Sequence, residues 1–307
     1  MAKTDLTKTI MARFDRLKTG RQNWETHWQE VADYMQPRKA DVTRTRSKGD
    51  KRTELVFDSS PIQAVELLAA SLHGMLTNPS TPWFSLRYKD QGLDMDDEAK
   101  LWLEGVTETM YTAFNRSNFQ QEIFELYHDL ITFGTAAMFI EEDNQDLLKF
   151  STRHINEIYI TENDKGRIDT VYRKFKITLR AAAQQFGTFL SEEAKGKVEK
   201  DPFDDIEILH AVYPRIEFDP TKKDKENMEF ESVYLEYKNG NELSVGGFVE
   251  FPFVVPRYLK ASHEIYGRSP AMTALPDVKM LNEMSKTTIK AAQKQVDPPL
   301  LVPDDGF

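Results

Sequence analysis

The spacing of apolar residues predicts that the first part of the chain is helical. Two apolar stripes repeat every three or four residues, which is the period of one face of an α-helix. The first stripe consists of Leu6, Ile10, Phe14 and Leu17. The second stripe consists of Trp24, Trp28, Val31 and Met35. This second stripe ends before Pro37, because a proline disfavours helical geometry in the residue that precedes it.

Capping signals predict further helices up to residue 134. In the segment 58–76, Ser60 is placed to cap a helix, and Pro61 suits its first turn. The acidic residues 96–98 favour another helix start, since negative charge is stabilising at a helix N-terminus. A further helix is expected to begin at Asn118 and to end at Gly134.

The pattern changes near residue 135 to the alternation that is typical of strands. The predicted strand segments are 135–143, 147–153 and a hairpin over 157–177. A short helix then ends at Gly187, and the acidic stretch 191–205 has the composition of a linker. A second β-rich block covers 206–258, where Asn239-Gly240 is a strong signal for a hairpin turn.

These elements predict a mixed fold of the α+β class, with helices at both ends of the chain and strands between them. The last clear element is a long helix from about Pro270 to Gln295. We divide the chain into four regions, which are the helical 1–134, the hairpin-and-helix region 135–202, the β-rich 203–262, and 263–307 with the long helix. No capped helix or closing strand is predicted at the end, so we expect the protein to continue beyond Phe307.

Composition narrows the classes of protein. The 307 residues are 40% hydrophobic, enough for a sizeable core, and the net charge of −10 argues against a protein that coats nucleic acid. A local basic patch is still compatible with that charge. Cysteine is absent, which excludes disulfides, thiolate metal sites and cysteine nucleophiles. The N-terminus has no apolar signal core, and the longest apolar stretch, 67–76, is too short to span a bilayer, so we expect a soluble protein without membrane contact.

A search for catalytic chemistry gives little. The chain has no P-loop, no GxGxxG, no GxSxG and no HExxH motif, and no two of its six histidines have metal-site spacing. His128 lies on a predicted helix, and we expect it to be a histidine of the core or of an interface whose hydrogen bonds are made within the protein. One carboxylate cluster has ligands that suit Mg²⁺, although a solvated turn between strands is the favoured interpretation. The cluster consists of Glu141, Glu142, Asp143 and Asp146. We therefore expect no enzyme, no cofactor and no metal.

A basic segment follows Pro37 and has no apolar period, so it is predicted to be a loop. Its cationic residues are Arg38, Lys39, Arg44, Arg46, Lys48, Lys51 and Arg52. The segment is either a solvated loop or a contact with phosphate or an acidic partner.

The long helix carries a second basic feature. Its lysines fall within roughly 80° of one another at 100° per residue. They are Lys279, Lys286, Lys290 and Lys294. The opposite side gathers Val278, Leu281, Ile289, Ala292 and Val296. The helix therefore has a basic face and a face suited to packing. The basic face is either solvent-exposed, with ion pairs to Glu283, or it presents lysines to a polyanion without sequence preference.

Three segments resemble the portal, or head-to-tail connecting, proteins of short-tailed phages. RLKTGRQNWETHWQEVADYMQPRK is similar to their opening helices, and SSPIQAVELLAASLHGMLTNPSTPWFSLRY to the block that follows. The segment from YGRSP to PDDG resembles the turn, long helix and Pro-Pro-Leu sequence where such chains leave their β-rich part. The matching residues are Gly267, Arg268, Ser269, Pro270, Ala274, Leu275, Asp277, Asn282, Pro298 and Pro299.

The resemblance implies a portal fold with helical wing segments, a β-rich wing and clip, and a long stem or channel helix. It implies a homo-oligomeric ring, usually a dodecamer, that conducts double-stranded DNA at one vertex of the capsid. The implied partners are terminase, the major capsid and scaffolding proteins, and tail adaptor proteins. The implied location is the virion, with assembly in the host cytoplasm. Region 203–262 is a candidate clip, where terminase and tail adaptors dock.

Two alternatives stay open from the sequence. One is another phage head-tail adaptor or minor capsid protein, which would lack the long helix followed by Pro-Pro. The other is a metal-dependent nuclease that uses the carboxylate cluster at 141–146.

Overall fold

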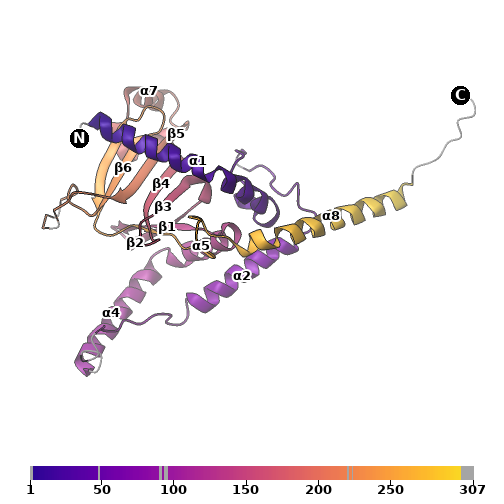
Figure 1. The fold of residues 1–307 in the computed structure, drawn as a ribbon, viewed down its shortest axis with the longest axis horizontal. Helices are drawn as coiled ribbons and strands as arrows, with labels where there is room; N and C mark the ends of the chain where they lie inside the picture. Colours follow the sequence, from indigo (N-terminus) through magenta and orange to yellow (C-terminus); the bar gives the residue numbers. More distant parts are fainter. Residues whose placement is uncertain are drawn as a thin grey trace, which may run out of the picture.

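The structure of the protein is a computed structural model. It describes residues 3–47, 49–89, 92, 96–219, 221–222 and 224–298. Helices and strands both contribute extensively, as the α+β prediction required, and Figure 1 shows them in one β-rich body from which long helices extend.

The helices are α1 (Lys3–Met35), α2 (Ser60–Leu76), α4 (Asp97–Arg116), α5 (Phe119–Phe133), α6 (Leu179–Phe186), α7 (Glu192–Lys200) and α8 (Pro270–Val296). Short 3₁₀ turns are η1 (Pro37–Lys39), η2 (Ile155–Glu157) and η3 (Gly187–Phe189). In Figure 1, α4 and α8 extend from the body on different sides, and α1 lies across the strands. None of the helices in the described part of the chain is long and apolar enough to cross a membrane.

The strands form two antiparallel sheets. A three-stranded sheet has the order β2-β1-β8, with bounds β1 (Ala137–Asp143), β2 (Leu147–Arg153) and β8 (Phe253–Val254). A five-stranded sheet follows chain order. Its strands are β3 (Ile158–Glu162), β4 (Ile168–Thr178), β5 (Asp205–Pro214), β6 (Phe230–Glu236) and β7 (Glu242–Phe248). The predicted hairpins are confirmed as β3–β4 and β6–β7.

The two faces of the five-stranded sheet have different partners, because side chains alternate between the faces of a strand. On one face, Ile10 and Phe14 of α1 are buried with Tyr159, Tyr172 and Leu209. Phe14 meets the Tyr159 ring edge-on, with ring centroids 4.7 Å apart. On the other face lie the three-stranded sheet and the α6–α7 pair. The sheet is therefore buried on both sides.

Helix α1 joins the two main cores. The two apolar stripes of the first 35 residues lie on this one continuous helix, whose N-terminal half packs on the sheet. Its C-terminal half packs Trp28 and Val31 in the larger core that includes α5. The Trp28 indole Nε1 donates a hydrogen bond to the Phe133 carbonyl oxygen at 3.0 Å, which fixes α1 against the end of α5. Burial of the Trp28 side chain contributes roughly 2–3 kcal/mol to this packing.

Two local predictions are wrong. Ser60 does not cap α2, because it is the first helical residue, and its own backbone N–H donates to Asp58 Oδ1 at 2.8 Å. The acidic stretch 191–205 is not a linker, since it contains α7. Ser191 caps that helix by accepting from the Ala194 N–H at 3.3 Å. A serine followed by two glutamates is a recognisable helix start.

The division of the chain into four regions remains a prediction. One observation bears on how the middle regions cooperate: β4 and β5, which lie on either side of residue 202, pair over eight positions of one sheet. These two regions therefore share a hydrogen-bonded ladder and bury their side chains in common cores.

Candidate functional site

Helix α8 begins at a well-defined cap. The Ser269 hydroxyl accepts a hydrogen bond from the Met272 N–H at 2.9 Å and donates one to the Thr132 carbonyl oxygen at 2.8 Å. Pro270 occupies the first helical turn, where its missing N–H costs nothing. Ser269 is buried, so one side chain both starts α8 and attaches it to the last turn of α5.

The turn before α8 crosses the end of α5 at a pair of glycines. Gly134 ends α5 in the left-handed conformation, with φ of 75°. Its carbonyl oxygen accepts from the Tyr258 N–H at 2.9 Å, and the Gly267 N–H donates to the Thr135 hydroxyl at 2.8 Å. A Cβ atom at Gly134 would lie 2.7 Å from the Gly267 carbonyl carbon. The two backbones approach so closely that neither position has room for a side chain.

Arg268 in the same turn points to the surface. Its guanidinium pairs with Glu264, with an Nε–Oε2 distance of 2.8 Å, and lies 5.2 Å from the centre of the Trp24 ring. The side-chain hydrogen bond to Glu264 raises the pKa of Arg268. Arg268 is thus held in place by local contacts, and its backbone pairs with Leu259 in both directions.

Asn282 fixes the middle of α8 to the segment before α2. Its Oδ1 accepts from the N–H groups of Phe57 (2.7 Å) and Asp58 (3.2 Å), and its Nδ2 donates to the Leu55 carbonyl oxygen at 2.9 Å. The Asn282 side chain is buried, and both its oxygen and its nitrogen are hydrogen-bonded. Among the other residues of the family match, Leu275 is buried, Ala274 half-buried, and Asp277 and Pro298 exposed, while Pro299 lies outside the described residues.

The four lysines of α8 divide into two pairs. Lys279 forms an ion pair with Glu30 of α1, and Lys286 pairs with Glu283, with an Nζ–Oε2 distance of 3.0 Å. Lys290 and Lys294 are exposed and have no ion-pair partner within the described part of the chain. Only the distal pair therefore presents uncompensated positive charge.

The apolar face of α8 differs from its prediction. We expected residues from Val278 to Val296 to form a packing face, but only Val278 is half-buried in the chain. Leu281 and Ile289 are 39% and 46% exposed, and Val296 is 87% exposed. The distal part of α8 extends away from the body, so no element of the described chain covers this face (Figure 1).

The basic segment after Pro37 is largely neutralised by acidic residues of other elements. Lys39 Nζ lies 2.6 Å from Asp129 Oδ1, and Arg38 pairs with Glu125 at 3.0 Å, both acceptors being on α5. Burial raises the pKa of Asp129, although the neighbouring Lys39 ammonium acts in the opposite direction. These pairs attach the segment to α5.

The remaining cations of the segment face α1 or the segment itself. Arg44 and Arg46 lie 3.5 and 3.9 Å from the Asp33 carboxylate, and Arg52 pairs with Asp41 at 2.5 Å. Lys51 is exposed, and Lys48 lies outside the described residues. Arg38 and Lys39 lie in η1, and the rest of the described segment is a loop, as predicted. Most of its positive charge forms ion pairs that hold the loop in place.

The carboxylate cluster at 141–146 lies at the end of β1 and in the turn that leads to β2. Asp143 Oδ2 accepts from the N–H groups of Gln145 (2.9 Å) and Asp146 (3.0 Å), and these hydrogen bonds lower its pKa. Glu141 pairs with Lys149 across the strands at 3.0 Å. No group of three metal-ligating side chains converges in the described residues. The turn interpretation therefore accounts for the cluster.

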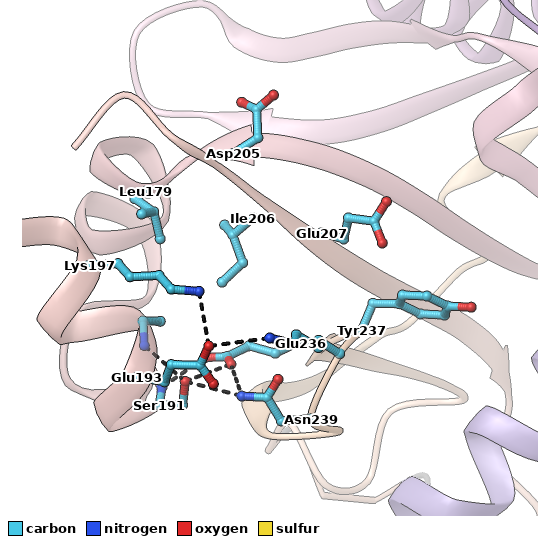
Figure 2. A pocket seen from close by; sticks show the side chains of 12 residues that line it. Leu179, Ser191, Glu193, Lys197, Asp205, Ile206, Glu207, Glu236, Tyr237 and Asn239 are labelled. Atoms are coloured by element: carbon cyan, nitrogen blue, oxygen red, sulfur yellow. Dashed lines mark hydrogen bonds and ion pairs between the residues drawn. The ribbon is translucent and has the colours of Figure 1, made fainter. Parts of the chain in front are cut away.

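A pocket beside α7 shows how polar groups are used in the β-rich body (Figure 2). Glu236 is buried and accepts from the Ser191 N–H (2.7 Å), the Ser191 hydroxyl (2.8 Å) and Asn239 Nδ2 (3.0 Å). At its rim, Glu193 pairs with Lys197 at 2.9 Å. Neutral donors satisfy the buried Glu236 carboxylate, and lysines pair with Glu193. Together these contacts hold α7 against the β6–β7 turn.

Two buried histidines are structural. His128 of α5 is 3% exposed and lies edge-on to Phe124, in agreement with its predicted role in the core. His210 lies between the two sheets, stacked on Tyr234 with ring centroids 3.8 Å apart, and its Nε2 is 2.9 Å from Ser232 Oγ. Burial, with a further contribution from Arg173 and Arg153, keeps the pKa of His210 well below 6.5.

His210 therefore predicts acid sensitivity. Below pH 6.5 the unfolded chain binds a proton at this position that the folded chain excludes, so stability falls as the pH decreases from about 7 towards the lowered pKa of His210. At pH 7.5 we expect His210→Gln to reduce the free energy of unfolding by about 1–2 kcal/mol, because stacking on Tyr234 is weakened, and therefore to lower the unfolding temperature. On acidification the variant should lose less stability than the wild type. Thermal unfolding at pH 7.5 and 5.5 measures both effects.

Ser232→Ala is the matched control, because it removes the hydrogen bond at 2.9 Å but keeps the titrating imidazole. It should retain the full acid effect. Equal losses of stability on acidification in His210→Gln and the wild type would contradict the prediction.

Comparison with known proteins identifies the family. Residues 7–307 match the family model described as bacteriophage head to tail connecting protein. The chain is 32% identical over 312 residues to the "Probable portal protein" of Bordetella phage BPP-1, covering 99% of this chain and 56% of that protein. It is 31% identical over 309 residues to the "Portal protein" of Salmonella phage epsilon15, covering 99% and 55%. The chain spans about half the length of the curated relatives that it matches. It belongs to the bacteriophage head to tail connecting protein family.

Proposed function

We propose that the protein is the subunit of a portal, a ring at one capsid vertex through which double-stranded DNA is packaged and ejected. The observation that carries the proposal is the family match over residues 7–307, together with one relative named "Portal protein" and one named "Probable portal protein". The fold supports it in a second way. Helix α8 is anchored firmly at its start, and its distal half offers surfaces that one copy leaves uncovered.

The ring is tested by negative-stain electron microscopy of the full-length protein, with the mass measured in parallel. We expect closed rings of about a dozen subunits around a central hole. A monomer or an isologous dimer at all protein and salt concentrations would contradict the proposal. Docking of terminase and tail adaptors on region 203–262, and contacts with the major capsid and scaffolding proteins, are further parts of this proposal.

We propose that Lys290 and Lys294 are the residues of α8 that face DNA. They are exposed and unpaired within the described chain, whereas Lys279 and Lys286 already have acidic partners. Contacts of this kind act on phosphates without reading sequence and weaken steeply with salt, which suits DNA that must slide.

The lysine pairs predict different outcomes on substitution. Replacing Lys290 and Lys294 with alanine should weaken retention of DNA by the ring and flatten its salt dependence, by a slope of roughly 0.9 for each phosphate that is no longer neutralised. Lys279→Ala with Lys286→Ala is the matched control on the same helix and should change the slope less. Retention measured between 50 and 200 mM salt, about the range over which phosphate binding weakens most visibly, separates the two variants. Identical salt dependences in both variants and the wild type would contradict the proposal that Lys290 and Lys294 contact DNA in the channel.

A further inference from the structure

A groove beside α4 is lined by aromatic rings. It has a volume of about 440 Å³ and lies between α4 and the segment 78–86, which comes earlier in the chain. This volume is in the range typical of ligand sites, roughly 300–1,000 Å³. The aromatic side chains that line it are Trp83, Phe84, Tyr111 and Phe114, and all four are half-buried. The groove therefore offers ring surface to a ligand.

Contacts with α4 hold the other wall of the groove in place. The Tyr111 hydroxyl accepts from the N–H groups of Trp83 and Phe84, both at 2.6 Å, and donates to the Phe84 carbonyl oxygen at 2.8 Å. One helical turn earlier, the Thr107 hydroxyl accepts from the Leu86 N–H at 3.3 Å. Phe84 also stacks on Tyr111, with ring centroids 4.4 Å apart. The groove is thus formed within one copy of the chain, so a ligand need not order it on binding.

The charged groups that line the groove are both acidic. Glu104 and Glu108 are exposed and lie four residues apart on α4, where like charges repel each other. Neither has an ion-pair partner in the described part of the chain, and Lys100, one turn before Glu104, pairs with Asp97 at 3.8 Å instead. None of the described residues that line the groove is a lysine, an arginine or a histidine. A cation would relieve the repulsion, whereas phosphate groups of DNA or of lipids would be repelled.

We propose that this groove binds an arginine side chain presented by an extended segment of a partner protein. Arginine suits both parts of the site, because its planar guanidinium stacks on aromatic rings and forms paired hydrogen bonds with carboxylates. Glu104 and Glu108 receive the guanidinium, and the rings contact the apolar residues beside the arginine. The inference goes beyond the portal proposal, since the groove belongs to a single copy and does not depend on a ring.

Peptide binding to the full-length protein tests the proposal. The probe is the peptide Gly-Leu-Arg-Leu-Gly, blocked at both ends and labelled with an uncharged fluorophore. Two matched peptides carry citrulline or lysine in place of the arginine, because citrulline keeps the shape without the charge and lysine keeps the charge without the planar group. By fluorescence anisotropy, we expect the arginine peptide to bind roughly tenfold more tightly than the citrulline peptide, with the lysine peptide between them.

Two variants of the protein locate the binding site. Glu104→Gln with Glu108→Gln removes the charges of the groove and should weaken binding of the arginine peptide roughly tenfold. Asp97→Asn with Glu98→Gln is the matched control, because it removes the same charge from the same helix at positions that do not line the groove. This control should change the affinity by less than about twofold, since distant exposed charges are screened. Circular dichroism verifies that both variants are folded.

The other outcomes overturn the proposal. Equal binding of the arginine and citrulline peptides would show that the carboxylates do not recognise the cation. Equal losses in the two variants would show a general attraction to an acidic helix, and absence of binding up to about 1 mM peptide would show that no site exists. In a second measurement, a benzophenone group on the arginine peptide should label the segment 78–86 or α4, and labelling only elsewhere would overturn the assignment. Electron microscopy tests the ring separately, so either proposal can fail without the other.

Discussion

Gly267→Ala is expected to destabilise the protein by about 3 kcal/mol or more. A methyl group at this position would meet the Gly134 carbonyl oxygen and would lie 2.9 Å from Arg257 Cβ and 3.2 Å from Arg257 Cα. Two of these three neighbours are backbone atoms, so no rotamer change relieves the overlap. The chain must instead separate α8 from the end of α5, which removes the Gly267 N–H hydrogen bond to Thr135. Thermal unfolding should show a midpoint lower by roughly 6–12 °C.

Gly105→Ala is the control for this prediction. Gly105 lies within α4 and a Cβ atom there would meet nothing within 4 Å, so alanine should stabilise the helix by about 0.5–1 kcal/mol. The two substitutions add the same methyl group and should shift the midpoint in opposite directions. If the free energy of unfolding of Gly267→Ala stayed within about 1 kcal/mol of the wild type, the close approach of Gly267 to Gly134 would tolerate a side chain.

The sequence predicted most of the elements, because local signals determine them. The α5 helix ends at Gly134 as its C-cap glycine indicated, and the Asn239-Gly240 turn joins β6 to β7. The motif from Gly267 to Pro270 was found only by resemblance. A glycine is needed at position 267 because its backbone closely approaches Gly134, which lies more than 100 residues earlier in the chain. No local sequence pattern indicates such a contact.

The candidate site was only partly predictable, since the partner of a charge is rarely its neighbour in sequence. The basic segment after Pro37 was predicted to be either a solvated loop or a contact with phosphate or an acidic partner. Its sequence did not show that Asp33, Glu125 and Asp129 neutralise most of it from two helices. Helical periodicity predicted that the four lysines of α8 lie on one side. It could not show that Lys279 pairs with Glu30, or that the opposite face stays uncovered in a single copy.

Arg21→Met is expected to be the most destabilising of the substitutions considered, at about 3–5 kcal/mol. Arg21 is 1% exposed, and its guanidinium lies 3.6 Å from the centre of the Tyr159 ring. It donates to the carbonyl oxygens of Ile155 (2.9 Å), Asn156 (2.8 Å) and Ile158, and it pairs with Glu25 at 2.7 Å. Methionine fills a similar volume, so the destabilisation measures the polar interactions: the substitution leaves buried carbonyl groups without donors and a carboxylate without its partner.

Arg21→Lys distinguishes the geometry of the guanidinium from its charge. A lysine keeps the positive charge near Glu25 but cannot reach three carbonyl oxygens with a planar fork, so we expect it to recover only part of the stability, leaving a deficit of about 2 kcal/mol. Arg16→Met, on an exposed position of α1, should stay within about 0.5 kcal/mol of the wild type. Denaturant unfolding of the three variants gives the comparison. If Arg21→Lys matched the wild type, charge alone would hold α1 to the start of β3, and the fork of hydrogen bonds would contribute nothing measurable.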